Sequence, residues 1–258
     1  MRIVIFANNR LGCAVTNWLR GQGEEIAGVV LHPPSRQKFG PEIVEAAGVK
    51  ESQIFDASRL EEPATRDAIG ALNAEMGISV LFGYILRRSI LDLFTRGCIN
   101  LHPALLPYNR GAYPNVWSIV DGTPAGVTLH YIDEHVDTGD IITQREVLVD
   151  AADTGGTLYD KLERAAETLF CETWPLVRSG KAPRIPQGSG GTYHRVRDVE
   201  LIDEIDLDRP YKAGDLINIL RARSFPPHRG AYFRDGNRKV YIELSLISEQ
   251  GAEDRRLQ

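Results

Sequence analysis

The sequence has little cysteine, no long apolar run and no surplus of basic charge, and each absence excludes a class of protein. The three cysteines, Cys13, Cys98 and Cys171, show no metal-ligand spacing, so we expect buried free thiols in a reducing compartment. No run approaches the roughly 20 apolar residues of a membrane span. The N-terminal apolar run ends at Asn8, too soon for a signal peptide. We therefore expect a cytoplasmic protein with no membrane partner.

Charge argues against a nucleic-acid partner. The chain carries 30 basic and 35 acidic residues, for a net charge of −5. The segment from Ser189 to Gln258 is neutral, because it holds twelve residues of each sign. A dedicated nucleic-acid-binding protein usually carries a basic domain or stripe, so we expect none here.

The N-terminal pattern predicts an α/β fold. Two β-branched apolar runs, 2–7 and 26–31, flank a helical pattern, which is the βαβ unit of a doubly wound sheet. We therefore expect a Rossmann-like, mostly parallel sheet flanked by helices. The first loop lacks G-x-G-x-x-G, so no dinucleotide fingerprint is present. Asn9 and Arg10 at this helix N-terminus could hold a phosphate, or form a tight turn with a solvated arginine.

A Gly/Ser-rich linker after Gln187 is expected to divide the chain into two domains. Residues 1–187 should form the catalytic domain, and 192–258 a small α+β subdomain ending in a frayed tail from 249. Further strands are predicted in the first domain at 54–55, 78–84, 99–102, 127–132 and 141–149, and helices at 41–48, 60–76, 89–97, 114–122 and 153–180. In the second, we expect a strand at 193–197, a helix at 214–223 and a hairpin that turns at 235–237.

The stretch 98–144 carries the candidate chemistry. Asn100 and His102 are two residues apart in a predicted strand, so their side chains share one face. Asp137 lies in a glycine-containing turn between two predicted strands. Taken singly, these residues could be a strand-end cap, a packing histidine and an Asx turn. Together they supply an amide, an imidazole and a carboxylate, which suit proton transfer at a polarised carbonyl. No metal-ligand cluster accompanies them.

Four motifs resemble the folate-dependent formyltransferases, the family of methionyl-tRNA formyltransferase. They are I-N-L-H-P-A-L-L-P from Ile99, R-G from Arg110, G-V-T-L-H from Gly126 and V-D-T-G-D-I-I from Val136. The resemblance covers residues 1–180 approximately, and it implies transfer of a formyl group from N10-formyltetrahydrofolate to a primary amine without a metal. It implies that Asn100 and His102 stabilise an oxyanion and that Asp137 accepts a proton. The implied donor-binding residues are Phe82, Tyr84, Ile85, Leu86, Arg87, Val136, Thr138, Gly139, Asp140 and Ile141.

The C-terminal segment suggests the acceptor. R-A-R-S-F-P-P-H-R-G-A-Y-F from Arg221 resembles bacterial nucleotide-sugar N-formyltransferases. This resemblance implies a nucleotide-linked amino-dideoxy sugar, as used in O-antigen or lipopolysaccharide biosynthesis. The implied acceptor-binding residues are Asn8, Asn9, Arg10, Tyr108, Arg110 and Tyr113. The predicted C-terminal hairpin offers an edge for a homodimer.

Three other functions stay open. A methionyl-tRNA formyltransferase would resemble the first domain, but the neutral C-terminal segment argues against it. A formyltetrahydrofolate hydrolase could use the same asparagine, histidine and aspartate with water as the acceptor. A catalytically silent folate-binding protein would retain the fold without turnover.

Overall fold

The computed structural model describes residues 1–248, which divide into two compact units, each discontinuous in sequence. The first, which we call the sheet unit, comprises Met1–His102, Val127–Arg145 and Ala165–Ser189. The second, the accessory unit, comprises Pro103–Gly126, Glu146–Arg164 and the chain from Gly190 onward. The predicted domains 1–187 and 192–258 stay a prediction. The predicted tail lies outside the described residues.

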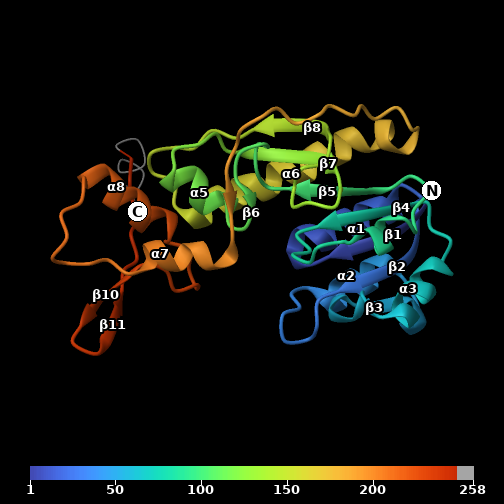
Figure 1. Ribbon diagram of the computed structural model, residues 1–258, viewed down its shortest axis with the longest axis horizontal. Coiled ribbons are helices and arrows are strands. Elements are labelled where there is room, and N and C mark those ends of the chain that lie inside the picture. Colours follow the sequence, from blue (N-terminus) through green and yellow to red (C-terminus); the bar gives the residue numbers. More distant parts are fainter. Residues whose placement is uncertain (249–258) are drawn as a thin grey trace, which may run out of the picture. The chain divides into compact units, whose positions relative to one another are not determined.

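The sheet unit is built on a seven-stranded sheet in the order β3-β2-β1-β4-β5-β7-β8 (Figure 1). Each neighbouring pair from β3 to β5 is parallel, and β7 runs antiparallel to β5. β1 lies inside the sheet, and its residues Ile3 to Ala7 are all fully buried, as expected of an apolar strand covered on both faces. The predicted fold class is confirmed. The strands are β1 Arg2–Ala7, β2 Glu25–Leu31, β3 Ile54–Asp56, β4 Met76–Val80, β5 Cys98–His102, β7 Gly126–Tyr131 and β8 Ile141–Glu146.

The helices of the sheet unit lie where the apolar pattern of the sequence predicts them, except that two predicted helices are too long. Their bounds are α1 Asn9–Gly21, α2 Gly40–Ala47, α3 Pro63–Gly70 and α4 Arg88–Leu91, and the long α6, Gly155–Arg178, enters this unit at Ala165. The predicted helix 60–76 is wrong in extent, because Pro63 starts α3 and the chain turns at Asn73, whose φ is +50°. The predicted helix 89–97 is a single turn followed by further turns that close at Gly97, whose φ is +74°.

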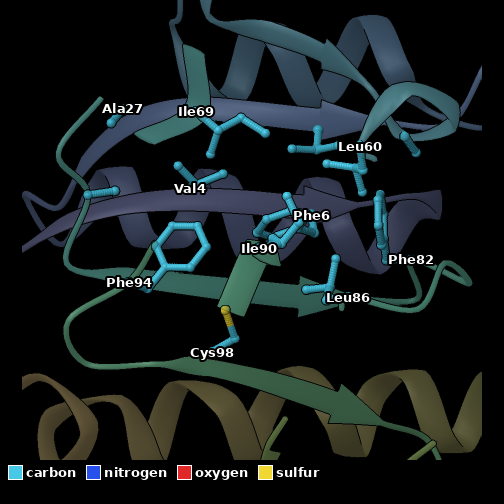
Figure 2. Close-up of a cluster of buried hydrophobic side chains, with 13 residues drawn as sticks. Val4, Phe6, Ala27, Leu60, Ile69, Phe82, Leu86, Ile90, Phe94 and Cys98 are labelled. Atoms are coloured by element: carbon cyan, nitrogen blue, oxygen red, sulfur yellow. The ribbon is translucent and has the colours of Figure 1, made fainter. Parts of the chain in front are cut away.

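A cluster of buried hydrophobic side chains packs one face of the sheet (Figure 2). The Phe6 ring meets the rings of Phe82 and Phe94 edge-on, at centroid distances of 5.4 and 6.0 Å. Cys98 lies in the same cluster, and burial raises the pKa of its thiol to about 12. Cys13 and Cys171 are only half-buried. The expectation of buried thiols is therefore correct for Cys98 and wrong for the other two.

The accessory unit contains short strands and helices. They are β6 Arg110–Gly111, α5 Pro114–Val120, β9 Tyr193–His194, α7 Glu200–Asp203, α8 Ala213–Ala222, β10 Tyr232–Asp235 and β11 Arg238–Tyr241. The predicted hairpin is confirmed, with Gly236 in its turn at φ +58°. The predicted strand 193–197 is too long, because the Asp198 carboxylate accepts a hydrogen bond from the Arg195 amide and starts a helical turn.

Among residues 1–248, no helix is long and apolar enough to cross a membrane.

Candidate active site

β5 positions the first two site residues. Asn100 pairs with Ser79 of β4 on one side and with His130 of β7 on the other. His102, two residues further on, is at the end of the strand and is 6% exposed. The alternation of side chains along a strand places Asn100 and His102 on the same face, as the sequence predicts.

The turn between β7 and β8 positions Asp137. Asp137 has φ +54°, a left-handed conformation that costs about 1–2 kcal/mol for a residue with a Cβ. The Asp133 carboxylate supports the turn by accepting hydrogen bonds from the Thr138 hydroxyl (2.6 Å) and the His135 amide (3.0 Å). Gly139 is required here, because a Cβ would lie 1.9 Å from the carbonyl oxygen of Tyr131. The backbone therefore fixes where the Asp137 side chain points.

The three predicted side chains meet at the end of β5. The Asn100 Nδ2 donates to Asp137 Oδ1 at 3.3 Å, and His102 Nε2 lies 3.6 Å from Asp137 Oδ2. The side chains of His102 and Asp137 are only 7% and 12% exposed. An amide donor, an imidazole and a carboxylate thus share one largely buried corner, where electrostatic interactions are stronger than in water. Their catalytic roles remain predictions.

His130 is a fourth member that the sequence analysis missed. Its Nε2 lies 3.2 Å from Asn100 Nδ2 and 3.6 Å from Asp137 Oδ1. Its Nδ1 lies 2.7 Å from the Tyr131 carbonyl oxygen, so in the neutral ring Nδ1 donates there and Nε2 is left to accept from Asn100. His130 therefore orients the Asn100 amide. The signal was the final residue of the G-V-T-L-H motif, but only the antiparallel pairing of β7 with β5 places it opposite Asn100.

The predicted donor-binding segment after β4 is a loop. The predicted strand 78–84 is wrong beyond Val80, because Leu81 and Gly83 have φ of +50° and +70°. The side chains of Phe82 and Leu86 belong to the apolar core, so only their backbone could contact a ligand. Ile85 is 62% exposed.

Two side chains of this loop have partners within the sheet unit. The Tyr84 ring packs against His32 at a centroid distance of 5.1 Å. The Arg87 guanidinium lies 3.5 Å from the Glu61 carboxylate. The remaining predicted donor-binding residues lie in the Asp137 turn and at the start of β8: Val136, Thr138, Gly139, Asp140 and Ile141.

The predicted acceptor-binding residues fall in both units. In the sheet unit, Asn8 is buried and its Oδ1 accepts from the Lys38 amide at 2.7 Å, so this atom has a structural role. Asn9 has φ +65° at the start of α1, and Arg10 is exposed. Tyr108, Arg110 and Tyr113 belong to the accessory unit and are at least partly exposed.

The corner between β5 and the Asp137 turn can donate hydrogen bonds to a developing oxyanion and accept a proton nearby. Within residues 1–248, no group of three or more histidine, cysteine or acidic side chains could hold a metal ion. Cys98 lies two residues before Asn100, but a thiol whose pKa is about 12 is not ionised near neutral pH. Cys98 is therefore unsuited to act as a nucleophile.

Comparison with known proteins identifies the family. A family model described as Formyl transferase matches residues 1–174, which is most of the chain. The chain belongs to the formyl transferase family. A second model, described as the N-formyltransferase dimerization C-terminal domain, matches residues 198–249. The family and the enzyme class predicted from the sequence are thereby confirmed.

Three relatives within this formyl transferase family are informative. The methionyl-tRNA formyltransferase of Agathobacter rectalis is 33% identical over 81% of this chain and 70% of its own length. A 4-N formyltransferase from Francisella tularensis has 29% identity and a TM-score of 0.82, over 96% of this chain and 98% of its own. The formyltransferase PseJ from Anoxybacillus kamchatkensis, solved with UDP-4,6-dideoxy-4-formamido-L-AltNAc and tetrahydrofolate, has 32% identity and a TM-score of 0.59, over 78% and 89%.

Proposed function

We propose that this protein transfers the formyl group of N10-formyltetrahydrofolate to the primary amine of a nucleotide-linked amino-dideoxy sugar. The observation that carries the proposal is the meeting of Asn100, His102 and Asp137 in one largely buried corner. These are the residue types that attack of an amine on a formyl carbon requires: donors for the oxyanion and a base for the proton.

The reaction proceeds by direct attack. The amine nitrogen forms a bond to the formyl carbon, and the formyl oxygen becomes an oxyanion that the Asn100 amide and the His102 imidazole stabilise. Asp137 orients His102 and accepts the proton lost by the attacking nitrogen, directly or through a water. Collapse of the oxyanion breaks the bond to N10 of the folate, and N10 takes up the proton that Asp137 accepted from the amine. His130 accepts one of the two Asn100 N–H groups, and the other, which donates to Asp137 Oδ1 in the protein without substrate, is the one proposed to turn to the oxyanion.

The folate site is proposed on the loop 82–87 and the turn 136–141. The first follows β4 at the carboxyl edge of the parallel strands, where open α/β folds bind ligands, and the second carries Asp137, whose side chain meets Asn100 and His102. At Phe82 and Leu86 only the backbone groups are available to a ligand, because both side chains are buried. The tetrahydrofolate in the PseJ structure supports this choice of donor.

One relative supports a sugar acceptor directly, because PseJ was solved with a formylated nucleotide sugar. The Francisella 4-N formyltransferase matches nearly the whole of this chain. Asn9 and Arg10 of the sheet unit are proposed to contact the nucleotide-sugar substrate, and Asn8 to support the loop that presents Asn9. Tyr108, Arg110 and Tyr113 of the accessory unit stay predictions. The relationship to methionyl-tRNA formyltransferase favours charged initiator tRNA as the second candidate. The neutral segment from Ser189 to Gln258 makes a poor surface for a polyanion.

Parallel reactions with the two kinds of acceptor distinguish the sugar assignment from the tRNA assignment. We expect formyl transfer from N10-formyltetrahydrofolate to at least one member of a panel of UDP- and dTDP-linked amino-dideoxy sugars, detected by mass spectrometry, and none to charged initiator tRNA in a parallel reaction. Formylation of the tRNA alone would overturn the sugar assignment. Formate release at the same rate with and without amine would instead identify a hydrolase.

The accessory unit is proposed to form a homodimer. The segment matched by the dimerization model exposes several large apolar side chains: Leu201 (83%), Leu207 (65%), Ile217 (45%) and Tyr241 (41%). Large apolar side chains of this kind are the ones that a subunit interface buries. We expect light scattering to give twice the chain mass of 28.7 kDa, and a monomer at micromolar concentration would contradict the proposal.

A further inference from the structure

Gln187 is held beside the Asp137 turn by the segment that precedes it. Ile185 exchanges two backbone hydrogen bonds with Ile141, at 2.8 and 3.0 Å, and so fixes the register of this segment against the start of β8. The Arg184 guanidinium adds a second anchor, 3.6 Å from the centre of the Tyr131 ring. Gln187 is half-buried among exposed neighbours. The position of Gln187 relative to the Asp137 turn is therefore fixed.

The Gln187 amide makes two hydrogen bonds to the backbone of the turn. Its Nε2 donates to the carbonyl oxygens of Asp137 (2.9 Å) and Gly139 (2.8 Å). An amide nitrogen carries two hydrogens, so both bonds form at once. They hold the peptide planes that follow Asp137 and Gly139, and the first of these comes directly after the left-handed Asp137. The direction of the Asp137 side chain depends on that backbone conformation.

We propose that Gln187 is a positioning residue of the formyl-transfer site, whose side-chain amide stabilises the left-handed turn and thereby aims the Asp137 carboxylate at Asn100 and His102. The proposal rests on the proposed function, because Gln187 acts through Asp137 and touches no reacting atom. It also gives a role to a residue that the sequence places at the start of a Gly-rich linker.

Replacing Gln187 with Leu removes both donated bonds at similar side-chain size. We expect kcat to fall about 10- to 100-fold, because small misplacements of a catalytic group cost that much. The KM for the amino-sugar nucleotide should stay within about threefold, since only the transition-state interaction is lost. Gln187→Glu should be at least as impaired, because its carboxylate faces two carbonyl oxygens. Ser189→Ala, an exposed neighbour on the same segment, should match wild type.

A double variant separates positioning from general destabilisation. If Gln187 acts through the Asp137 carboxylate, Gln187→Leu should lower kcat by less than about twofold in an Asp137→Asn background. An equal fold-loss in both backgrounds would overturn the proposal, as would a Gln187→Leu enzyme with a wild-type kcat.

A measurement on the free protein keeps this proposal separate from the proposed function. In ¹⁵N-histidine NMR spectra, Gln187→Leu should move the ring resonances of His102 and His130, which flank Asp137, and leave those of His228 in place. Absence of turnover in wild-type protein with every amino sugar would refute the proposed function alone. Unchanged His102 and His130 resonances would refute the role of Gln187, whatever the substrate.

Discussion

Replacing Asp137 with Asn is expected to lower kcat for formyl transfer about 10²- to 10⁴-fold, the usual contribution of a positioned general base. Asparagine has nearly the same shape and tolerates the left-handed φ of +54° at this position. It retains an oxygen that can accept from Asn100, but it cannot take the proton of the attacking amine. The thermal midpoint, measured by calorimetry, should therefore change little, while kcat, measured by steady-state kinetics, falls by this factor.

The matched control is Glu134→Gln, which neutralises an exposed carboxylate in the same loop. We expect wild-type kinetics from this variant. An Asp137→Asn enzyme within about threefold of wild type would remove Asp137 from the mechanism, because a general base cannot be neutralised at so small a loss.

Replacing His102 with Ala is expected to lower kcat about 10²- to 10³-fold, as found when one donor to an oxyanion is removed. His102 is 6% exposed, so the substitution also leaves a cavity, and some loss of thermal stability should accompany it. His102→Gln offers an amide donor of similar reach and should recover part of the lost rate. The effect is measured by steady-state kinetics of wild type and the two His102 variants, at equal concentrations of folded protein.

His135 provides the control, because its side chain is exposed on the neighbouring loop. His135→Ala should keep wild-type kcat and KM. Comparable losses in the His102 and His135 variants would mean that removal of any local histidine perturbs the turn, and His102 would lose its assigned role.

The shared face of Asn100 and His102 and the turn that carries Asp137 could be predicted because both depend on local rules. Period-2 alternation aligns the first two, and the glycine-containing segment between two strands predicts the turn. The apolar runs that form β1 and β4 likewise identify a sheet covered on both faces. These features require only neighbouring residues, and the structure reproduces them.

Features that depend on distant pairing could not be predicted. His130 joins the site because β7 runs antiparallel to β5 in one particular register, which no local pattern specifies. Gln187 reaches the Asp137 turn from a residue 50 positions further along the chain. Its Gly-Ser-Gly-Gly neighbours are typical of a linker, and this composition concealed the contact.

Local backbone conformations caused the remaining errors. Leu81 is apolar and follows a buried strand, so the sequence extends that strand to Tyr84, whereas its left-handed φ of +50° ends β4 at Val80. Helix propensity likewise extends the segment after Ser89 beyond its single turn. In both places tertiary packing outweighs a weak intrinsic preference.

The most direct test of the central claim follows the formyl carbon itself. Wild-type protein is incubated with N10-formyltetrahydrofolate labelled with ¹³C in the formyl group and with the amino-sugar nucleotide that reacts best, beside the Asp137→Asn variant. The account predicts that the label appears as a formamide on the sugar amine with wild type, and at least about 100-fold more slowly with the variant. Label that appears only in free formate, or at equal rates with both proteins, would contradict it.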